Sequence, residues 1–171
     1  MSARRRSLAL VGLAVLLAAT ACAYRTTSRG RSLRGTVAVP FLDNRTGQPD
    51  LEVQLTEALV EALEQDGSLD VVNPGGEDFL LQGAVTRYAE APFSISAAGT
   101  ADEYKLSIAV VVSFVDQTGM QRGWRDKRIT GSANFYIESS AAGEELTREG
   151  AEARALEQIV EDVLDAIFGE W

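Results

Sequence analysis

The strongest constraint on the fold is an alternation of apolar with polar or small residues between positions 104 and 114. The apolar positions are Tyr104, Leu106, Ile108, Val110, Val112 and Phe114, and the positions between them include Lys105, Ser107, Ala109 and Ser113. Because successive side chains of a strand point to opposite faces of a sheet, this pattern predicts a β-strand with one buried face. The rest of the chain must therefore supply neighbouring strands and a layer that covers that face.

Three further stretches predict strands. Residues 36–42 are apolar and rich in β-branched side chains, as expected for a buried strand. Residues 78–88 carry a second apolar run, and residues 122–137 carry a third. Glycines at positions 123 and 131 argue against a regular strand in the third run, because glycine in a strand interior has no side chain to pack.

Two stretches predict helices. Leucines occupy every fourth position between residues 51 and 63, acidic residues lie off that stripe, and Gly67 suits a left-handed helix end. Residues 144–168 carry a second apolar stripe. We interpret residues 43–47 as a turn, and the short apolar piece at residues 69–72 is given no place in the sheet.

The predicted order is strand, helix, strand, strand, strand, helix. This order predicts an α/β fold of the α+β kind, a two-layer sandwich in which a right-handed crossover leads into an antiparallel meander. Each helix has one apolar stripe, so we expect two helices packed on one face of a four-stranded mixed sheet. The other face of the sheet is left to water or to a partner.

The N-terminal residues predict export. Arginines at positions 4–6 precede an uncharged apolar run from Leu8 to Ala19, and small residues follow it. The run is too short to cross a bilayer permanently, so the pattern is typical of a signal peptide, here residues 1–21. The paired arginines also allow a twin-arginine signal, although basic pairs are common in this region of signal peptides.

Cys22 is the only cysteine of the chain and directly follows the predicted cleavage site. Residues 19–21 fit an ordinary small-x-small site, and with the cysteine they resemble the signal of a bacterial lipoprotein, whose acyl chains, palmitate among them, anchor the new N-terminus. A lone exposed thiol in an exported protein has no disulfide partner, which favours acylation. We therefore expect Cys22 to be lipidated, and Ala23 behind it is similar to the pattern of outer-membrane lipoproteins.

We expect the mature chain to comprise a flexible linker, residues 22–34, and a single domain, residues 35–171. Residues 1–21 carry three arginines and no acid, so their removal changes the formal charge from −9 to −12. Such an acidic chain is unsuited to binding nucleic acid. The basic residues near the predicted lipid suit either an anionic membrane surface or a solvated tether.

The residues on which most enzymes depend are missing from the sequence. The chain has no histidine, and its single cysteine is assigned to the N-terminus. This removes the usual general base, the usual zinc ligands and the Cys/His nucleophile pair, so we expect no metal, no cofactor and no catalysis. Composition alone leaves a serine-plus-lysine hydrolase open. Asp102 and Glu103 are interpreted as a solvated turn, because adjacent strand residues point to opposite faces.

A series of short motifs resembles the LptE family, the lipopolysaccharide-assembly lipoproteins of the Gram-negative outer membrane. The motifs are Cys22-Ala23-Tyr24, Val37-Ala38-Val39-Pro40-Phe41, Asp43-Asn44-Arg45-Thr46, Pro49-Asp50-Leu51-Glu52, Leu55-Thr56-Glu57-Ala58-Leu59, Gln82-Gly83-Ala84-Val85 and Glu103-Tyr104-Lys105-Leu106. Together they cover nearly the whole mature chain. The resemblance implies two helices on a four-stranded sheet, in agreement with the elements predicted from the residues.

The resemblance also implies a role without catalysis. It implies an outer-membrane lipoprotein on the periplasmic side, acting as plug and assembly partner of the LptD β-barrel in lipopolysaccharide transport to the cell surface. Candidate contacts to the lipid phosphates follow from local chemistry, because cations bind phosphate well. They are Arg122, Trp124, Arg125, Lys127 and Arg128. The alternative is a strand near a turn that simply exposes its charges.

Single aromatic residues are candidates for the barrel interface or for the core, namely Tyr88, Phe93 and Tyr136. A lipoprotein activator of a peptidoglycan synthase shares the anchor and the α/β plan, and it is the alternative function. Such activators usually have a longer linker, whereas residues 22–34 span at most roughly 40 Å when fully extended. The short tether favours a partner at the membrane itself. A periplasmic enzyme is the third class, disfavoured by the absent histidine.

Overall fold

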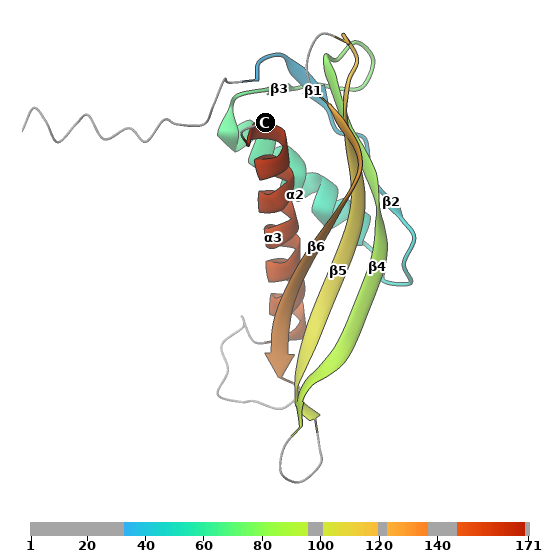
Figure 1. Ribbon diagram of the computed structural model, residues 1–171, viewed down its shortest axis with the longest axis vertical. Coiled ribbons are helices and arrows are strands. Elements are labelled where there is room, and N and C mark those ends of the chain that lie inside the picture. Colours follow the sequence, from blue (N-terminus) through green and yellow to red (C-terminus); the bar gives the residue numbers. More distant parts are fainter. Residues whose placement is uncertain (1–32, 96–100, 120–122, 137–146, 170–171) are drawn as a thin grey trace, which may run out of the picture. The chain divides into compact units, whose positions relative to one another are not determined.

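The computed structural model describes residues 33–95, 101–119, 123–136 and 147–169. Within these residues the elements are β1 (Thr36–Ala38), β2 (Asp43–Asn44), α2 (Leu51–Asp66), β3 (Asp70–Val71), β4 (Phe79–Ile95), β5 (Ala101–Asp116), β6 (Trp124–Tyr136) and α3 (Arg148–Phe168). The strands form one mixed sheet in the order β3-β1-β4-β5-β6, and β2 pairs with β4. Both helices lie on the same side of this sheet (Figure 1).

The sheet confirms the predicted mixed topology but not the predicted number of strands. β1 is parallel to β3 and β4, and β4, β5 and β6 form the expected antiparallel meander. The prediction of four strands is wrong, because the described part of the sheet has six. The two additional strands, β2 and β3, are two residues long. A strand of that length shows no period, so β2 fell within a predicted turn and β3 within a short apolar piece.

The helix ends are determined by local chemistry. Asp50 and Gly67 flank α2 with left-handed backbone angles, φ 65° and φ 67°, and the N–H of Gly67 donates to the carbonyl of Leu63. At α3 the side chain of Thr147 accepts a hydrogen bond from the N–H of Gly150 at 3.0 Å. The prediction for α3 began at residue 144, and residues 144–146 lie outside the described residues.

The core lies between the helices and the sheet. The apolar positions of β5 from Leu106 to Phe114 are almost fully buried, as their alternation predicted. Phe79 of β4 stacks on Phe114 with ring centroids 4.8 Å apart. Each fully buried side chain of this size contributes about 1.5–3 kcal/mol to stability. The apolar side chains of the alternating strand therefore belong to the core between the sheet and the helices, and α3 packs directly against this strand.

Gly131 in β6 has a packing role that its sequence context did not show. A Cβ atom built at this position would collide with the backbone carbonyl of Ala155 and would lie 3.0 Å from Cγ1 of Ile159. The absence of a side chain thus allows the backbone of α3 to come close to the sheet. A glycine that argued against a regular strand is required by the helix above it.

Polar side chains connect α2 to β2 and to the segments on either side of β2. The side-chain amide of Asn44 donates to the carbonyl of Gln48 at 2.8 Å and to Glu52 at 2.6 Å. The buried hydroxyl of Thr56 accepts from the N–H of Leu42 at 3.2 Å and donates to the carbonyl of Glu52 at 2.6 Å. Asn44, Glu52 and Thr56 belong to the motifs that resemble the LptE family, so part of that resemblance has a structural cause.

Candidate interface on the open face of the sheet

The face of β4, β5 and β6 that points away from the helices, called here the open face, carries small and polar side chains. Residues paired across neighbouring strands share a face, so the register defines its members. They are Gln82, Ala84, Arg87, Ala89 and Ala91 of β4, Lys105, Ser107, Ala109, Val111 and Ser113 of β5, and Arg128, Thr130, Ser132 and Asn134 of β6. A face of this composition is suited to contact polar groups rather than to support a second apolar layer.

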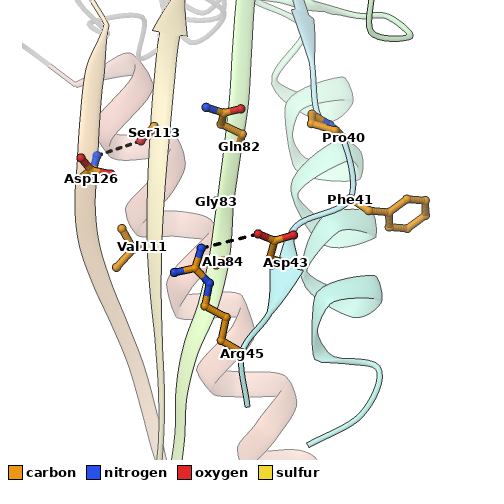
Figure 2. Close-up of a pocket in the computed structure, with 10 residues that line it drawn as sticks. All are labelled: Pro40, Phe41, Asp43, Arg45, Gln82, Gly83, Ala84, Val111, Ser113 and Asp126. Carbon is orange, nitrogen blue, oxygen red and sulfur yellow. Dashed lines mark hydrogen bonds and ion pairs between the residues drawn. The ribbon is translucent and has the colours of Figure 1, made fainter. Parts of the chain in front are cut away.

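A concavity of about 400 Å³ lies at one end of the open face. The segment from Pro40 to Arg45 forms one wall, Ala84 and Val111 lie at the floor, and Asp126 lies on the far side (Figure 2). Asp43 and Arg45 form an exposed ion pair with a distance of 3.7 Å between Oδ2 and Nη2. An exposed ion pair of this kind contributes at most about 1 kcal/mol, so its members can exchange partners at low cost.

Phe41 adds an exposed apolar group beside this concavity. Its side chain is 71% exposed, and its ring points away from the concavity in Figure 2. The backbone leaves β1 at Ala38 and passes Pro40 before β2 begins, which places Phe41 on the outside of the connection. An exposed phenylalanine at a loop surface is suited to contact with a partner, since aromatic residues are enriched among those that contribute most to interface energies.

A bulge in β6 determines on which face of the sheet the side chains of residues 124–128 lie. Val112 pairs with Lys127 and Phe114 pairs with Trp124, so the single residue Ser113 faces two residues of β6. One of them, Asp126, has a left-handed φ of 52°, and its N–H donates to Oγ of Ser113 at 2.9 Å. A bulge shifts the alternation by one residue, so the side chains before and after it no longer follow a single period.

The structure does not bring the predicted lipid-contact residues together on one face. Trp124 is half-buried beside Phe114, and its Nε1 donates to the carbonyl of Ala166 at 3.1 Å. Lys127 lies with its Nζ 5.6 Å from the centre of the Trp124 ring, on the helix side of the sheet. Arg128 belongs to the open face.

Of the other two predicted contact residues, the structure describes only Arg125. Arg125 lies exposed in the bulge. Arg122 lies outside the described residues.

Two cations of the open face were not predicted as site residues. Arg87 and Lys105 lie on the same face as Arg128, and none of the three forms an ion pair within the described part of the chain. Lys105 was assigned to the polar side of its strand from the alternation. Its relation to Arg87 and Arg128 depends on strand register, which no local motif showed.

The charge of the protein is distributed unevenly between its two layers. Helices α2 and α3 contain eleven acidic and two basic residues, whereas β4, β5 and β6 contain five of each. The strong negative charge of the whole chain is therefore concentrated in the helix layer. An anionic ligand would be repelled least, and attracted most, at the open face.

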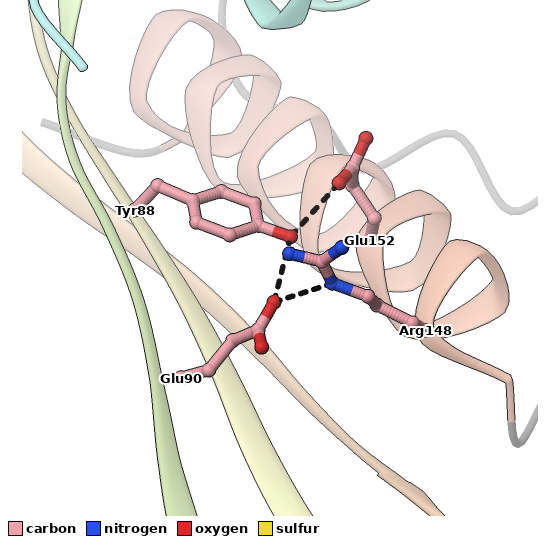
Figure 3. Close-up of polar contacts among 4 residues, drawn as sticks. All are labelled: Tyr88, Glu90, Arg148 and Glu152. Atoms are coloured by element: carbon pink, nitrogen blue, oxygen red, sulfur yellow. Dashed lines mark hydrogen bonds and ion pairs between the residues drawn. The ribbon is translucent and has the colours of Figure 1, made fainter. Parts of the chain in front are cut away.

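A polar cluster fastens the start of α3 to β4 on the helix side (Figure 3). The hydroxyl of Tyr88 lies 3.1 Å from carboxylate oxygens of Glu90 and of Glu152, and Nε of Arg148 donates to Glu90 at 2.6 Å. Burial raises the pKa of Tyr88 above its ordinary value, and the hydrogen bond with Glu152 raises that pKa further. Tyr88 is thus occupied inside the fold.

The other two aromatic candidates remain accessible. Phe93 is 58% exposed and Tyr136 is 38% exposed. Both stay available for contact with a partner.

The fold and the open face together define a small α/β domain, with a helix layer on one side and a polar, partly basic sheet surface on the other. The chain belongs to the LptE lipopolysaccharide-assembly family, whose family model matches residues 34–167. This is a non-enzymatic lipoprotein family. No curated protein sequence matches the chain. Within the described residues, no helix has the length and hydrophobicity to span a membrane.

Solved structures share the fold at low sequence identity. A hypothetical protein from Chlamydia trachomatis has a TM-score of 0.55 at 14% identity, covering 81% of this chain and 100% of that chain. An uncharacterized lipoprotein B from Nitrosomonas europaea has a TM-score of 0.52 at 15% identity, covering 82% and 90%. Rare lipoprotein B from Shewanella oneidensis has a TM-score of 0.50 at 15% identity, covering 76% and 90%. These likenesses establish the fold.

Proposed function

We propose that the protein is an outer-membrane lipoprotein of lipopolysaccharide transport, anchored on the periplasmic side through Cys22 after removal of residues 1–21. It acts as plug and assembly partner of an LptD β-barrel and catalyses no reaction. The observation that carries this proposal is the match of the LptE family over residues 34–167, which spans nearly all of the described domain. The small size of the domain and its polar open face suit a role based on binding.

The open face is the surface we assign to the transported lipid. Lipopolysaccharide is an anion, and the acidic helix layer would repel it. Arg128 would contact phosphate together with Arg87 and Lys105 of the same face, and Arg125 would contribute from the bulge. Arg122 remains a candidate contact from its sequence alone. Trp124 and Lys127 take a supporting role, because the indole of Trp124 packs beside Phe114 and lies near the Lys127 ammonium group.

The partner is tested by purifying the tagged full-length protein from detergent-solubilised outer membrane and identifying what copurifies in stoichiometric amount. Copurification of a large LptD-like barrel is the expected result. Recovery of a peptidoglycan synthase instead would contradict the plug role and support the alternative function. A Cys22→Ser variant is the matched control for the anchor, because it keeps the domain intact and should leave the membrane fraction.

The lipid-binding surface is tested separately. Replacing Arg87, Lys105 and Arg128 together by glutamine should lower binding of purified lipopolysaccharide by at least about tenfold, since three charge-assisted contacts are lost. Arg154→Gln on α3 removes one positive charge from the opposite layer and should leave binding within about twofold. If only total charge mattered, the triple variant, which removes three charges, would lose no more affinity than the cube of the factor lost by Arg154→Gln, and that result would refute the assignment to the open face.

A further inference from the structure

The outer edge of β4 is a strand edge that the described fold leaves partly unpaired. β1 pairs with β4 at Phe79 and Leu80, and β2 pairs with it at Ala84 and Val85. Beyond Val85, no strand among the described residues pairs with β4 on that side, although β4 continues to Ile95. In Figure 1 the green strand β4 runs on past the end of β2.

The register shows which backbone groups face outward along this edge. The carbonyl of Val85 accepts a hydrogen bond from the N–H of Arg45, so Val85 faces the side of β2. Hydrogen-bonded and non-hydrogen-bonded pairs alternate in an antiparallel ladder, and the shift between Val85 and Arg87 moves the alternation by one residue. The N–H and C=O groups of Tyr88 and Glu90 therefore point to the outer edge.

Pro92 supports this assignment independently. It continues the same alternation after Tyr88 and Glu90, and its pairing with Tyr104 leaves its nitrogen on the outer side. Proline has no N–H, and within sheets it is confined to edge strands with that side facing solvent. Pro92 also ends the edge that a further strand could use, so the free stretch is limited to residues 86–91.

The other long edge of the sheet, formed by β6, is partly covered by side chains. Gln158 of α3 reaches β6 and accepts a hydrogen bond from the N–H of Ser132 at 3.0 Å. Charged residues and a bulge occupy the start of β6, which is how proteins commonly protect an edge. No comparable side-chain cover of the N–H groups of Tyr88 and Glu90 exists among the described residues.

Side chains beside the β4 edge indicate the chemistry of its occupant. The guanidinium of Arg87 is exposed and forms no ion pair within the described part of the chain, whereas the carboxylate of Glu90 is bound by Arg148. Ala89 and Ala91 are small, so a neighbouring strand would meet no bulky side chain on the open face. Phe93 lies exposed at the end of the stretch and offers apolar contact.

We propose that β4 accepts an additional β-strand at residues 86–91, supplied by an extended segment of a partner protein that carries an acidic side chain opposite Arg87. Strand addition gives affinity through main-chain hydrogen bonds and specificity through alternate side chains. The backbone groups of Tyr88 and Glu90 supply the main-chain hydrogen bonds, and the side chain of Arg87 supplies the specificity. Arg87 belongs to both surfaces, but the proposal does not rest on the lipopolysaccharide role, because the unpaired backbone groups of the β4 edge carry it.

The test uses the full chain in detergent micelles, labelled with ¹⁵N, and a ten-residue peptide that alternates valine with glutamate. We expect amide shift changes confined to β4 near residues 86–94, and no binding by the same peptide with all amides methylated. Before peptide is added, the amides of Tyr88 and Glu90 should exchange with solvent faster than those of Arg87 and Ala89. Shift changes elsewhere, or slow exchange at Tyr88 and Glu90, would overturn the proposal.

Two matched variants separate strand pairing from other effects. Glu90→Pro removes one outward N–H at a position equivalent to Pro92, and Glu90→Ala removes the same carboxylate but keeps that N–H. Affinity should fall by roughly tenfold in the proline variant relative to the alanine variant, as expected for one backbone hydrogen bond. Equal affinities would refute strand addition.

The preference of the β4 edge for acidic or basic peptides tests the proposal even if the proline variant fails to fold. Arg87→Glu should reverse the preference, so that a valine–lysine peptide binds better than the valine–glutamate peptide. An unchanged preference would refute the role of Arg87. A dimer that forms without peptide and is lost only in the proline variant would show that a second copy occupies the edge, which also overturns the proposal.

Discussion

Replacing Gly131 by alanine should destabilise the fold more than any other single methyl group added to β6. The new Cβ would collide with the backbone carbonyl of Ala155, and it would lie 3.0 Å from Cγ1 of Ile159. A side chain can change rotamer to relieve such a contact, but a helix backbone cannot, so α3 must move away from the sheet. Overpacking typically costs 1–3 kcal/mol, and this rigid obstacle indicates the upper end, about 3 kcal/mol.

The loss is measured by urea denaturation followed by circular dichroism, with thermal melting as a second readout. A loss of about 3 kcal/mol lowers the melting temperature of a domain of this size by roughly 6–12 °C. Gly47→Ala is the matched control, because no atom lies within 4 Å of a Cβ built there. The control should stay within about 0.5 kcal/mol of the parent protein. If Gly131→Ala behaved like the control, the close approach of α3 to β6 would be refuted.

Three further predictions concern single contacts. Thr56→Val leaves the N–H of Leu42 without its acceptor and should lower the free energy of unfolding by about 1–3 kcal/mol, as measured by denaturation. Thr56→Ser keeps the hydroxyl and should retain most of the stability of the parent protein. Trp124→Phe keeps an aromatic ring but loses the hydrogen bond to the carbonyl of Ala166, which should cost about 1 kcal/mol in the same assay. The pKa of Tyr88 is raised in the folded state. The stabilisation that this shift gives the fold is therefore complete below the pKa of about 10 that tyrosine has in the unfolded chain, and it is lost as pH rises beyond that value. Stability should therefore fall more steeply above pH 10 in the parent than in Tyr88→Phe, and parallel pH profiles would contradict this.

The regular elements were predictable where a period was long enough to be seen. The alternation around Leu106 and Ile108 identified the central strand, and the leucines that begin at Leu51 identified the first helix. The two-residue strands β2 and β3 could not be predicted, because parallel pairing at a single point depends on the position of a distant partner. The packing role of Gly131 could not be predicted for the same reason, because the helix that packs against it, α3, is distant in sequence.

The candidate interface was less predictable than the fold. Local sequence grouped Trp124, Lys127 and Arg128, but ordinary alternation separates Arg128 from Lys127, and the bulge at Asp126 separates Arg128 from Trp124. Conversely, Arg87 and Arg128 are far apart in sequence and share a face only through the register of three strands. Side-chain orientation past a bulge depends on one extra residue, and that residue leaves no periodic signal.

The position of β1 between β3 and β4 determines the order in which the sheet can be completed. The pair Val37 and Phe79 closes a far longer stretch of chain than the links within the meander, so its formation loses more chain entropy and is expected late. In stopped-flow experiments Ala109→Gly should therefore slow folding, whereas Val37→Ala should mainly speed unfolding, and the reverse result would contradict this order. The first strand to be synthesised is then joined late to the meander, because its partner β4 exists only after α2 and β3 have been made.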